Sequence, residues 1–532
     1  MTQENRKMSR SRTSEASIRN APLALWGRAL GCFRSSPQGQ VLVLATIAMF
    51  VFIGSVALAA DVGFLWTDRR HMQTAADAAA IAAARALRNS QSVTSAADSV
   101  AGLDGFTNGT NGAVVTVNNP PSSGLYAGNS NYVEVIIKQP APTYFMRLFG
   151  YSSVNVAARS VGGSINGPAC IYALDPSASG AVSLTGNISI NASCGLVDDS
   201  SSSTALSATG NGTIKTTGTG VAGNYSASGN MTFTPTPNIH VAPVSDPLAN
   251  VSAPAVGTCT WAPATGVGTP ISGIHATYNL TPVVWSGGIN ISGIITTLNF
   301  AAGIYGNGIS FTGTVTTANF NPGQYQDSGG SGNSITLQGN AAANFATGSY
   351  TFCGPVSIIG NNTTTLQPGL YVGGISITGN ANVTFSPGTY VLAGGGLSIT
   401  GNSTIAGAGV TFYNTSSSSF AYKPINITGN ETGSLSAPTS GPLAGILFFQ
   451  DRSVANTPAN ASEVVGNSST TFDGALYFPT TGLTWLGNSS ASGYLIVVAD
   501  TVTVTGNSTM TLGANYAALA NGSPIKSSAL YE

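Results

Sequence analysis

The pattern of hydrophobic and polar positions divides the chain into three parts. Residues 41–60 are uncharged throughout, which is enough to cross a bilayer as a helix. Ala75–Ala86 then holds nine alanines, and neither glycine nor proline occurs from Leu65 to Ala101, so a helical stalk is predicted. Beyond residue 169 short alternating runs such as Gly374–Thr378 are rich in β-branched residues and predict strands.

A small mixed unit is predicted between the stalk and the strand-rich part. Strands are expected at Ala113–Val117, Tyr132–Lys138 and Val154–Ser160, with a short helix at Thr143–Leu148. This order is typical of a pilin-like head. The glycine-rich run Gly162–Pro168 is interpreted as a linker.

The strand-rich part carries a repeat of about 20 residues. Gly-Asn pairs begin at Gly339, Gly360, Gly379 and Gly401, at spacings of 21, 19 and 22 residues. A second marker, Gly-x-Tyr, keeps phase with the first. Three short strands and three turns use about 20 residues, which is one turn of a parallel β-helix. Asparagines stacked on successive turns are expected to form hydrogen-bonded ladders.

The predicted fold is mainly β: a right-handed parallel β-helix, or solenoid, after an N-terminal transmembrane helix, a helical stalk and a small α/β pilin-like unit. The predicted boundaries are 1–40 for a basic, disordered cytoplasmic tail, 41–60 for the transmembrane helix, 61–105 for the stalk, 106–161 for the pilin-like unit, 169–515 for the β-helix and 516–532 for a C-terminal tail.

Charge is scarce. Charged residues make up 7% of the chain, against about a quarter in typical proteins. After Arg159 the positive residues are Lys215, Lys423, Arg452 and Lys526. Nucleic acid is therefore not an expected partner, because phosphate binding needs clustered Lys and Arg.

The cysteines favour an oxidising compartment. Cys170, Cys194, Cys259 and Cys353 lie in the repeat part, and Cys32 stands alone in the basic arm. An even number favours disulfides. We favour Cys170–Cys194, about one repeat apart, which leaves Cys259–Cys353 as the second pair; free buried thiols are the alternative. The spacing fits no zinc motif, and no metal or cofactor is expected.

The N-terminal arm sets the predicted orientation. Seven Lys or Arg precede residue 41, which favours a cytoplasmic N-terminus. Ala57-Leu58-Ala59 is similar to a signal-peptidase site, so a cleaved, secreted form is the alternative to an uncleaved anchor.

One stretch resembles a known family. Ala60-Asp61-Val62-Gly63 follows the apolar segment directly, and Met72–Ala80 reads MQTAADAAA. This pattern, over about residues 38–90, resembles the N-terminal segment of Tad (tight adherence, or Flp) pilus-assembly proteins of TadG type. The residues that carry the motif are Asp61, Gly63, Gln73, Ala76 and Asp77.

The resemblance implies a single-pass bacterial inner-membrane protein with a periplasmic or surface-exposed body and with other pilus-assembly or pilin-like subunits as partners. No catalytic residue carries over, since the family is not known for an activity. Type IV-like pilins are cut after a glycine with Glu five residues on. Here Gly39 is followed at that place by Leu44, so prepilin processing is not expected.

Enzymatic chemistry is the competing hypothesis, because parallel β-helices often cleave polysaccharides. Glycoside hydrolysis needs two carboxyl groups about 5–10 Å apart. Asp198 with Asp199, or Asp451 with Asp473 on neighbouring turns, are the candidate pairs. Surface glycans would instead bind exposed aromatic residues, for which the candidates are Trp261, Trp285 and Trp485.

The remaining candidates point to structure. Asp198-Asp199 precedes four serines and reads as a turn, and His71, His240 and His275 lie beside no nucleophile motif. We therefore expect a structural, non-enzymatic protein of pilus assembly or adhesion, with a membrane-tethered carbohydrate-binding or carbohydrate-cleaving β-helix as the alternative.

Overall fold

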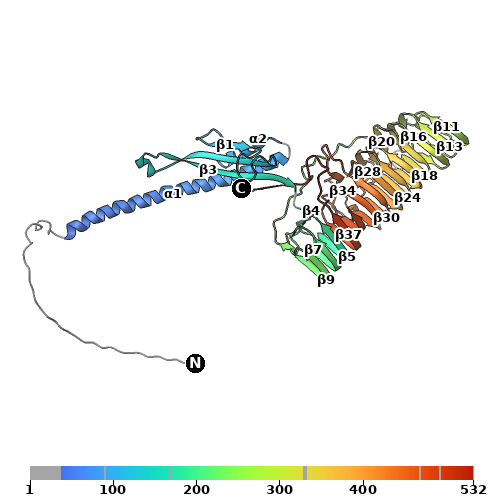
Figure 1. Ribbon diagram of the computed structural model, residues 1–532. Coiled ribbons are helices and arrows are strands. Elements are labelled where there is room, and N and C mark those ends of the chain that lie inside the picture. Colours follow the sequence, from blue (N-terminus) through green and yellow to red (C-terminus); the bar gives the residue numbers. More distant parts are fainter. Residues whose placement is uncertain are drawn as a thin grey trace, which may run out of the picture. The chain divides into compact units, whose positions relative to one another are not determined.

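The computed structural model describes residues 37–88, 91–166, 169–327, 332–466, 469–490 and 493–530. Most of the predicted tail 1–40, and Cys32 with it, lies outside these residues. The chain divides into two compact units, one formed mainly by residues up to Gly162 and one by Gly163–Ala529 (Figure 1).

The first unit places one long helix against a small sheet. Its elements in order are α1 (Pro37–Arg88), α2 (Val93–Leu103), β1 (Val114–Asn118), β2 (Tyr132–Pro142), the 3₁₀ helix η1 (Met146–Phe149) and β3 (Ser153–Asn166). The apolar stretch and the alanine run are therefore one continuous helix of 52 residues. β1 and β2 pair antiparallel, from Val114 opposite Lys138 to Asn118 opposite Glu134.

The core of this unit lies under the second half of α1. Six of its alanines are fully buried, as are alternate residues of β2. β3 continues through Asn166 and so takes in most of the segment predicted as a linker. The buried residues are Ala75, Ala76, Ala79, Ala80, Ala83, Ala84, Val133, Val135 and Ile137.

The second unit is a parallel β-solenoid of about 15 turns, as the repeat predicts. In a typical turn β24 (Ile375–Gly379), β25 (Asn382–Phe385) and β26 (Gly388–Ala393) follow one another. β24 pairs parallel with β27 (Leu397–Gly401), so Gly379 lies opposite Gly401, and Gly360 lies opposite Gly379. The Gly-Asn glycines thus align down one edge.

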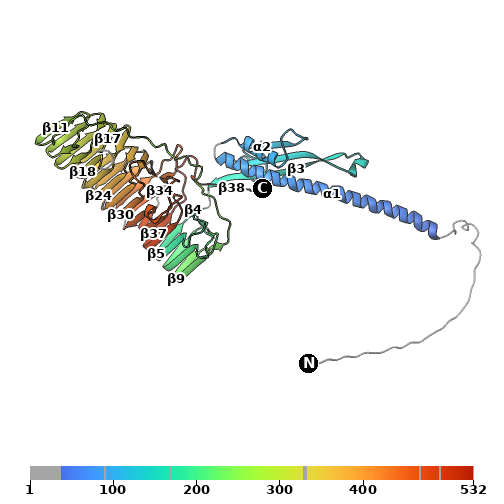
Figure 2. The same ribbon diagram turned by 180° about the vertical axis from the view of Figure 1, so that it is seen from behind.

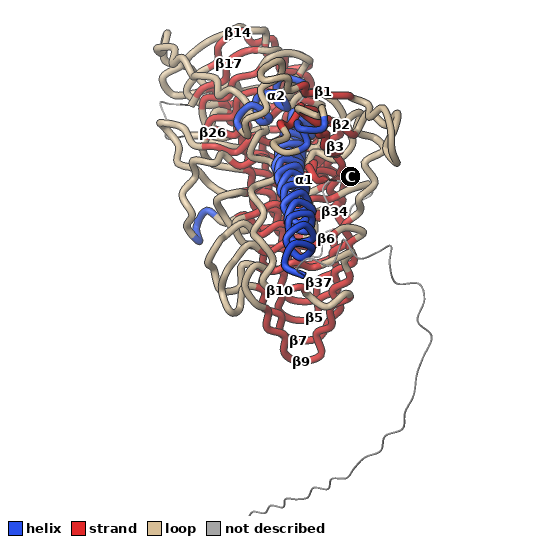
Figure 3. Tube along the Cα trace, turned by 90° about the vertical axis from the view of Figure 1, so that its left-hand side faces the viewer, coloured by secondary structure: helices blue, strands red, loops and turns tan. Residues whose placement is uncertain are grey.

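The other strands of the solenoid also pair parallel with strands of neighbouring turns; strands are drawn in red in Figure 3 and loops in tan. They are β4 (Ala169–Ala173), β5 (Val182–Ala192), β6 (Gly195–Asp198), β7 (Leu206–Lys215), β8 (Thr219–Val221), β9 (Tyr225–Thr234), β10 (Asn238–Ile239), β11 (Ile274–Leu280), β12 (Ile289–Ile291), β13 (Ile294–Phe300), β14 (Gly303–Tyr305), β15 (Ile309–Phe311), β16 (Thr314–Phe320), β17 (Gly323–Gln326), β18 (Ile335–Gly339), β19 (Ala342–Phe345), β20 (Tyr350–Cys353), β21 (Val356–Gly360), β22 (Thr363–Leu366), β23 (Gly369–Val372), β28 (Thr404–Ala408), β29 (Val410–Thr415), β30 (Ile425–Gly429), β31 (Thr432–Ser436), β32 (Ile446–Gln450), β33 (Ser462–Gly466), β34 (Ser469–Phe478), β35 (Leu483–Ser490), β36 (Leu495–Ala499) and β37 (Val502–Leu512). The last strand of the chain, β38 (Lys526–Leu530), is not part of the solenoid but belongs to the four-stranded sheet of order β1-β2-β3-β38, so the segment 516–532, predicted as a tail, contains a strand.

The Gly-Asn step makes one corner of each turn. Gly379 has φ +96° and Gly401 has φ +108°, a region that favours glycine. The asparagines that follow donate to one another along the stack, from Asn380 Nδ2 to Asn361 Oδ1 (3.1 Å) and from Asn402 Nδ2 to Asn380 Oδ1 (3.2 Å). The predicted asparagine ladder is confirmed.

The tyrosine side chains of the Gly-x-Tyr marker pack in the interior of the solenoid. Tyr371 and Tyr390 are fully buried with ring centroids 5.7 Å apart. Each hydroxyl donates to a backbone carbonyl, Tyr371 to Gln367 O (2.6 Å) and Tyr390 to Leu366 O (2.9 Å). The rings therefore add apolar area without leaving a buried hydroxyl unpaired.

The turns do not stack in chain order. β37 pairs parallel with β5 over eleven positions, from Val502 opposite Val182 to Leu512 opposite Ala192, and β36 pairs with β4. In Figure 1 the teal β5 accordingly lies beside the red β37, and the yellow-green β11 lies at the far end; Figure 2 shows the same order from behind. The chain therefore enters and leaves the solenoid at neighbouring turns, an order that the repeat by itself does not determine.

An irregular return segment, residues 240–273, makes this order possible. It leaves β10 at one end and runs along the stack to β11 at the other. On the way the Val244 N–H donates to Asp199 Oδ1 (2.8 Å), and Arg452 Nη2 donates to Leu248 O (2.8 Å). Further on the Thr265 N–H donates to Val284 O (2.7 Å).

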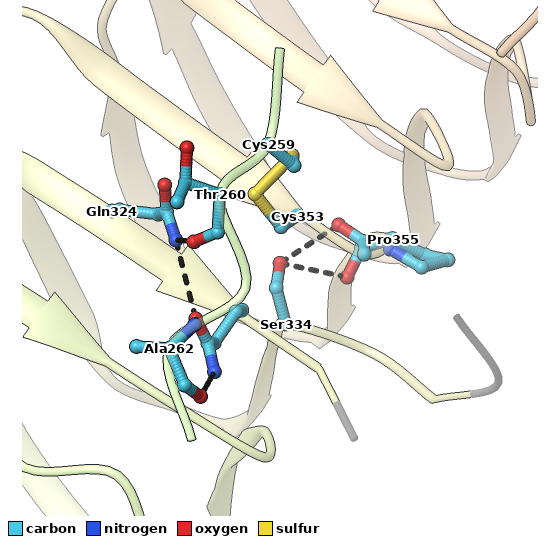
Figure 4. The surroundings of a disulfide bond; sticks show 9 residues. Cys259, Thr260, Ala262, Gln324, Ser334, Cys353 and Pro355 are labelled. Carbon is cyan, nitrogen blue, oxygen red and sulfur yellow. Dashed lines mark hydrogen bonds between the residues drawn. A yellow bond between two sulfur atoms is a disulfide. The ribbon is translucent and has the colours of Figure 1, made fainter. Parts of the chain in front are cut away.

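Disulfides hold both the turns and the return segment. Cys170–Cys194 and Cys259–Cys353 are both formed, as we favoured from the spacing. The first joins β4 to the residue before β6, and the second ties the return segment to β20. Beside it Gln324 Nε2 donates to Thr260 O, as Figure 4 shows.

Candidate functional site

The N-terminal half of α1 is an exposed apolar surface. Its large apolar side chains are exposed, up to 76% at Phe50, whereas one face of the same helix is buried from Met72 onward. Among the described residues one helix is long and apolar enough to cross a membrane, and its span is Val41–Leu87. Solvent exposure of about five helical turns of apolar side chains is unfavourable in water and favourable in lipid.

The motif residue Asp61 anchors the sheet to the helix. Its carboxylate is 1% exposed and accepts three successive backbone N–H groups, Tyr144–Met146, at 3.0, 2.9 and 2.6 Å. These N–H groups open η1 and have no partner within it. Asp61 therefore fixes the β2–β3 hairpin tip to the point where the uncharged stretch of α1 ends.

Further along α1, the motif residue Gln73 binds β3. Gln73 Nε2 donates to Asp77 Oδ1 (2.8 Å) and to Arg159 O of β3 (3.0 Å), and Ala76 is fully buried. Gly63 is exposed with open space around it. Of the five motif residues, Asp61 and Gln73 thus bind the hairpin tip and β3 directly, Asp77 orients Gln73 from within α1, and Ala76 is buried.

Gly162 sets the distance between β3 and α1. A Cβ atom there would lie 2.2 Å from Ala80 O and 3.2 Å from Ala84 Cβ. The alanine face of α1 is thus covered by the chain's own sheet. The alanine run predicts a helical stalk from sequence, but it does not indicate this internal contact.

A buried ion pair lies within the sheet and has no signal in the sequence beyond an acidic residue inside an apolar strand. Arg159 Nε donates to Glu134 Oε1 at 2.6 Å, and Glu134 is 0% exposed. Burial alone raises the pKa of Glu134, but hydrogen bonds from Ser122, Asn118 and Arg159 outweigh it and lower the pKa to about 2. The carboxylate is therefore charged at neutral pH.

The hairpin tip itself is apolar and exposed. Leu148 and Phe149 are 81% and 82% exposed, and Tyr144 and Tyr151 are more than half exposed. The Tyr144 ring contacts the Phe64 ring of α1, with centroids 5.4 Å apart. The sequence predicts a short helix at Thr143–Leu148 but does not indicate this surface.

The candidate carboxylate pairs of the solenoid serve backbone groups. Asp198 Oδ1 accepts the Ser200 N–H (3.0 Å), and Asp199 binds the return segment. Burial raises the pKa of both, that of Asp198 to about 6. The pair makes a turn, as its sequence context favours.

Asp451 and Asp473 bind different groups. Asp451 accepts hydrogen bonds from Thr415 Oγ1 and from the Ser453 N–H (2.9 Å). Asp473 Oδ1 accepts the Gly493 N–H (2.6 Å). Each carboxylate therefore serves a nearby turn, as in the Asp198-Asp199 pair.

The candidate aromatic and histidine sites are dispersed. Trp485 is 1% exposed and packs on Phe472, so it is not a surface residue. Trp261 is 38% exposed on the return segment, and Trp285 is partly buried. His71 contacts the Phe106 ring, His275 bonds to Ser272 O and His240 is exposed. Across the described ranges no group of three or more metal-binding side chains converges.

A cleft of about 440 Å³ borders the return segment. Its walls combine prolines with polar side chains, among them Asp199, Asp246 and Arg452. Arg452 is already engaged, because its Nε donates to the Tyr477 hydroxyl (2.6 Å) and its Nη2 to the return segment.

Comparison with known proteins identifies the helical segment. Residues 39–86 match the family model Tad, described as putative Flp pilus-assembly TadE/G-like. No curated protein and no solved structure matches the chain significantly. Residues 39–86 thus form a Tad segment of TadE/G-like type, which with the apolar helix and the β-solenoid fits a membrane-anchored, pilus-related protein.

Proposed function

We propose that this chain is a membrane-anchored structural component of Tad/Flp-type pilus assembly or surface attachment. The observation that carries the proposal is the coincidence of the Tad match, residues 39–86, with a helix whose first half is exposed and apolar and whose second half holds a pilin-like sheet. In this role α1 packs against other pilus-assembly or pilin-like subunits, and the solenoid is exposed to the periplasm or the cell surface.

The face available to partners is the first half of α1. The alanine face is occupied by the chain's own sheet, so subunit contacts fall on residues 41–60. The basic N-terminal arm favours a cytoplasmic N-terminus. Two formed disulfides support an oxidising compartment for the solenoid, the bacterial periplasm or the surface. With so few charges the solenoid offers a long polar, uncharged surface, and we assign it a structural rather than an enzymatic role.

Site-specific photo-crosslinking in cells that assemble a Tad pilus tests this role. A photoreactive residue at Phe50, on the exposed half of α1, is expected to give adducts with small pilin-like or TadE/G-like membrane subunits. The same residue at Leu103, exposed at the end of α2, is the control. Absence of protein adducts from Phe50 and its neighbours, together with normal piliation after deletion of the gene, would contradict the proposal.

The cleft beside the return segment favours a second candidate, a membrane-tethered glycan-binding protein. Its mixed polar and apolar walls suit a sugar, and Trp261 lies on the same return segment. Binding of the purified chain to a glycan array, weakened by Asp246→Ala, supports this candidate. An array without signal opposes it.

A further inference from the structure

The exposed hairpin tip between β2 and β3 has no counterpart in the Tad match, which ends at residue 86. We infer that residues 144–151, the membrane loop, insert into the headgroup layer of the same bilayer that α1 crosses, so that the pilin-like sheet sits on the membrane surface. This inference rests on the proposed membrane anchor.

The position of the loop along α1 follows from its contacts. The uncharged stretch 41–60 is 20 residues long, about 30 Å as a helix, which equals the hydrocarbon thickness of a bilayer. Asp61 is the next residue, and its carboxylate holds the loop. Phe64, about 4.5 Å further along the axis, contacts Tyr144. The headgroup layer is about 5–8 Å deep on each side, so the loop lies at its level.

The direction of the sheet agrees with this level. The contacts of α1 follow the same order along β3 as along the helix. Asp61 binds the loop before β3, Gln73 binds Arg159 O, and Ala80 lies against Gly162. β3 therefore runs along α1 away from the uncharged stretch. The β2–β3 tip is the end of the sheet nearest the membrane, as its reach along α1 in Figure 1 shows.

The composition of the loop fits a lipid interface. Tyrosine and other aromatic residues are enriched at the headgroup level because each ring has an apolar body and a polar edge. Here two tyrosines flank Leu148 and Phe149, and Arg147 is exposed beside them, where its guanidinium can meet lipid phosphates. Trp66 of α1, 63% exposed, belongs to the same level.

The position of the loop at the lipid interface also explains why the carboxylate of Asp61 is hydrogen-bonded to three backbone N–H groups. A carboxylate next to the hydrocarbon layer is costly unless it is satisfied. The three N–H donors satisfy it internally, and the next charges on α1 are Asp68, Arg69 and Arg70, a further two turns away. In the interval 61–67 the one charged side chain, Asp61, faces the protein, so no charge faces the lipid at this level.

Fluorescence depth measurements on the full chain test the inference. Cys32→Ser leaves the four disulfide-bonded cysteines, and single cysteines carrying an environment-sensitive dye replace Leu148, Leu103 or Phe50. The protein is reconstituted into vesicles of phosphatidylethanolamine and phosphatidylglycerol with lipid-bound nitroxide quenchers. Leu103, 84% exposed at the end of α2, is the matched control, and Phe50 reports the span.

The expected result is strong quenching at Phe50, clear quenching with a blue-shifted emission at position 148, and neither at position 103. Phe149→Ser, which leaves the backbone bonds to Asp61 intact, is expected to reduce the quenching at position 148 at least twofold. Quenching at Phe50 with a water-like signal at 148 overturns the membrane loop and leaves the anchor standing. A blue shift at 148 without quenching means that protein covers the loop and also overturns it. No quenching at Phe50 overturns the anchor and the loop together.

Discussion

At the scale of single residues, short polar side chains do most of the organising. Asp61 caps the N-terminal end of η1 and Gln73 joins α1 to β3, while stacked asparagines hydrogen-bond to one another at the solenoid corner. The sequence indicates the motif residues and the ladder because both recur in recognisable patterns. It cannot indicate Glu134 with Arg159, since the two residues are far apart in the chain and their pairing depends on the packing of β2 and β3.

The buried carboxyl of Asp198 gives a prediction about pH. Its pKa is raised from 3.8 to about 6, mainly by burial and then by Asp199 and Asp175. Because the folded state holds this proton more tightly, its contribution favours folding below about pH 4 and is lost as pH rises to about 6. Asp198→Asn removes the ionisation. We expect its stability relative to the wild type to rise by about 2 kcal/mol between pH 4 and pH 7.

Denaturant unfolding at the two pH values measures the difference. Glu463→Gln, at an exposed position of β33, is the control and should show no such trend. Equal stability differences at pH 4 and pH 7 for Asp198→Asn would mean that folding does not raise the pKa of this carboxyl.

At the scale of elements, the periodicity of the sequence predicts the strands and its composition predicts the helix. The 20-residue repeat predicts three-stranded turns because β-branched runs alternate with residues that tolerate a left-handed corner. The structure has these turns in register, Gly360 to Gly379 to Gly401. What composition cannot decide is which helical face is buried. An alanine face suits a partner helix or a sheet equally, and β3 of the same chain covers it.

Gly162 gives a prediction for this contact. Gly162→Ala places a Cβ 2.2 Å from Ala80 O, so β3 and α1 have to separate, at a cost of about 1–3 kcal/mol. Hydrogen exchange is expected to accelerate across residues 75–86 of α1, with the solenoid unchanged. In the control Gly102→Ala the nearest atom to the new Cβ is at 3.5 Å, and α2 should be unaffected or slightly stabilised. Unchanged protection of α1 in Gly162→Ala would show that the close approach is absent.

At the scale of the whole molecule, each of the two units is organised by long-range contacts. The solenoid places its first turns after its last, so that Asn187 bonds to Asn507 across 320 residues. The repeat explains why this is possible, since every turn presents the same Gly-Asn corner and any two turns can stack. It does not determine which turns stack, because neighbouring sequence copies fit almost equally well.

The disulfide of the return segment gives a prediction at this scale. Cys259–Cys353 closes a loop of 94 residues. In the chain-entropy model its removal by Cys259→Ser with Cys353→Ser lowers stability by at most about 4–5 kcal/mol. Hydrogen exchange should rise first in residues 255–265, because without the disulfide only a few hydrogen bonds attach the return segment to the solenoid.

Cys170→Ser with Cys194→Ser is the matched control, with a separation of 24 residues. It is expected to loosen β4 and β6 and to leave residues 255–265 protected. Equal exchange of the return segment in both variants would indicate that its hydrogen bonds to Gln324 and Gln326 suffice without the disulfide.

The sequence by itself determined the apolar span, the Tad segment, the period of the solenoid and the favoured cysteine pairs, because each is written in local composition or in the spacing of like residues. The tertiary structure alone decided the seam between β37 and β5, the path of the return segment, the burial of the alanine face and the exposure of the hairpin tip. These features depend on which of several compatible surfaces pack together. The repeat period and the composition are the same whichever surfaces pack, so they cannot distinguish the alternatives.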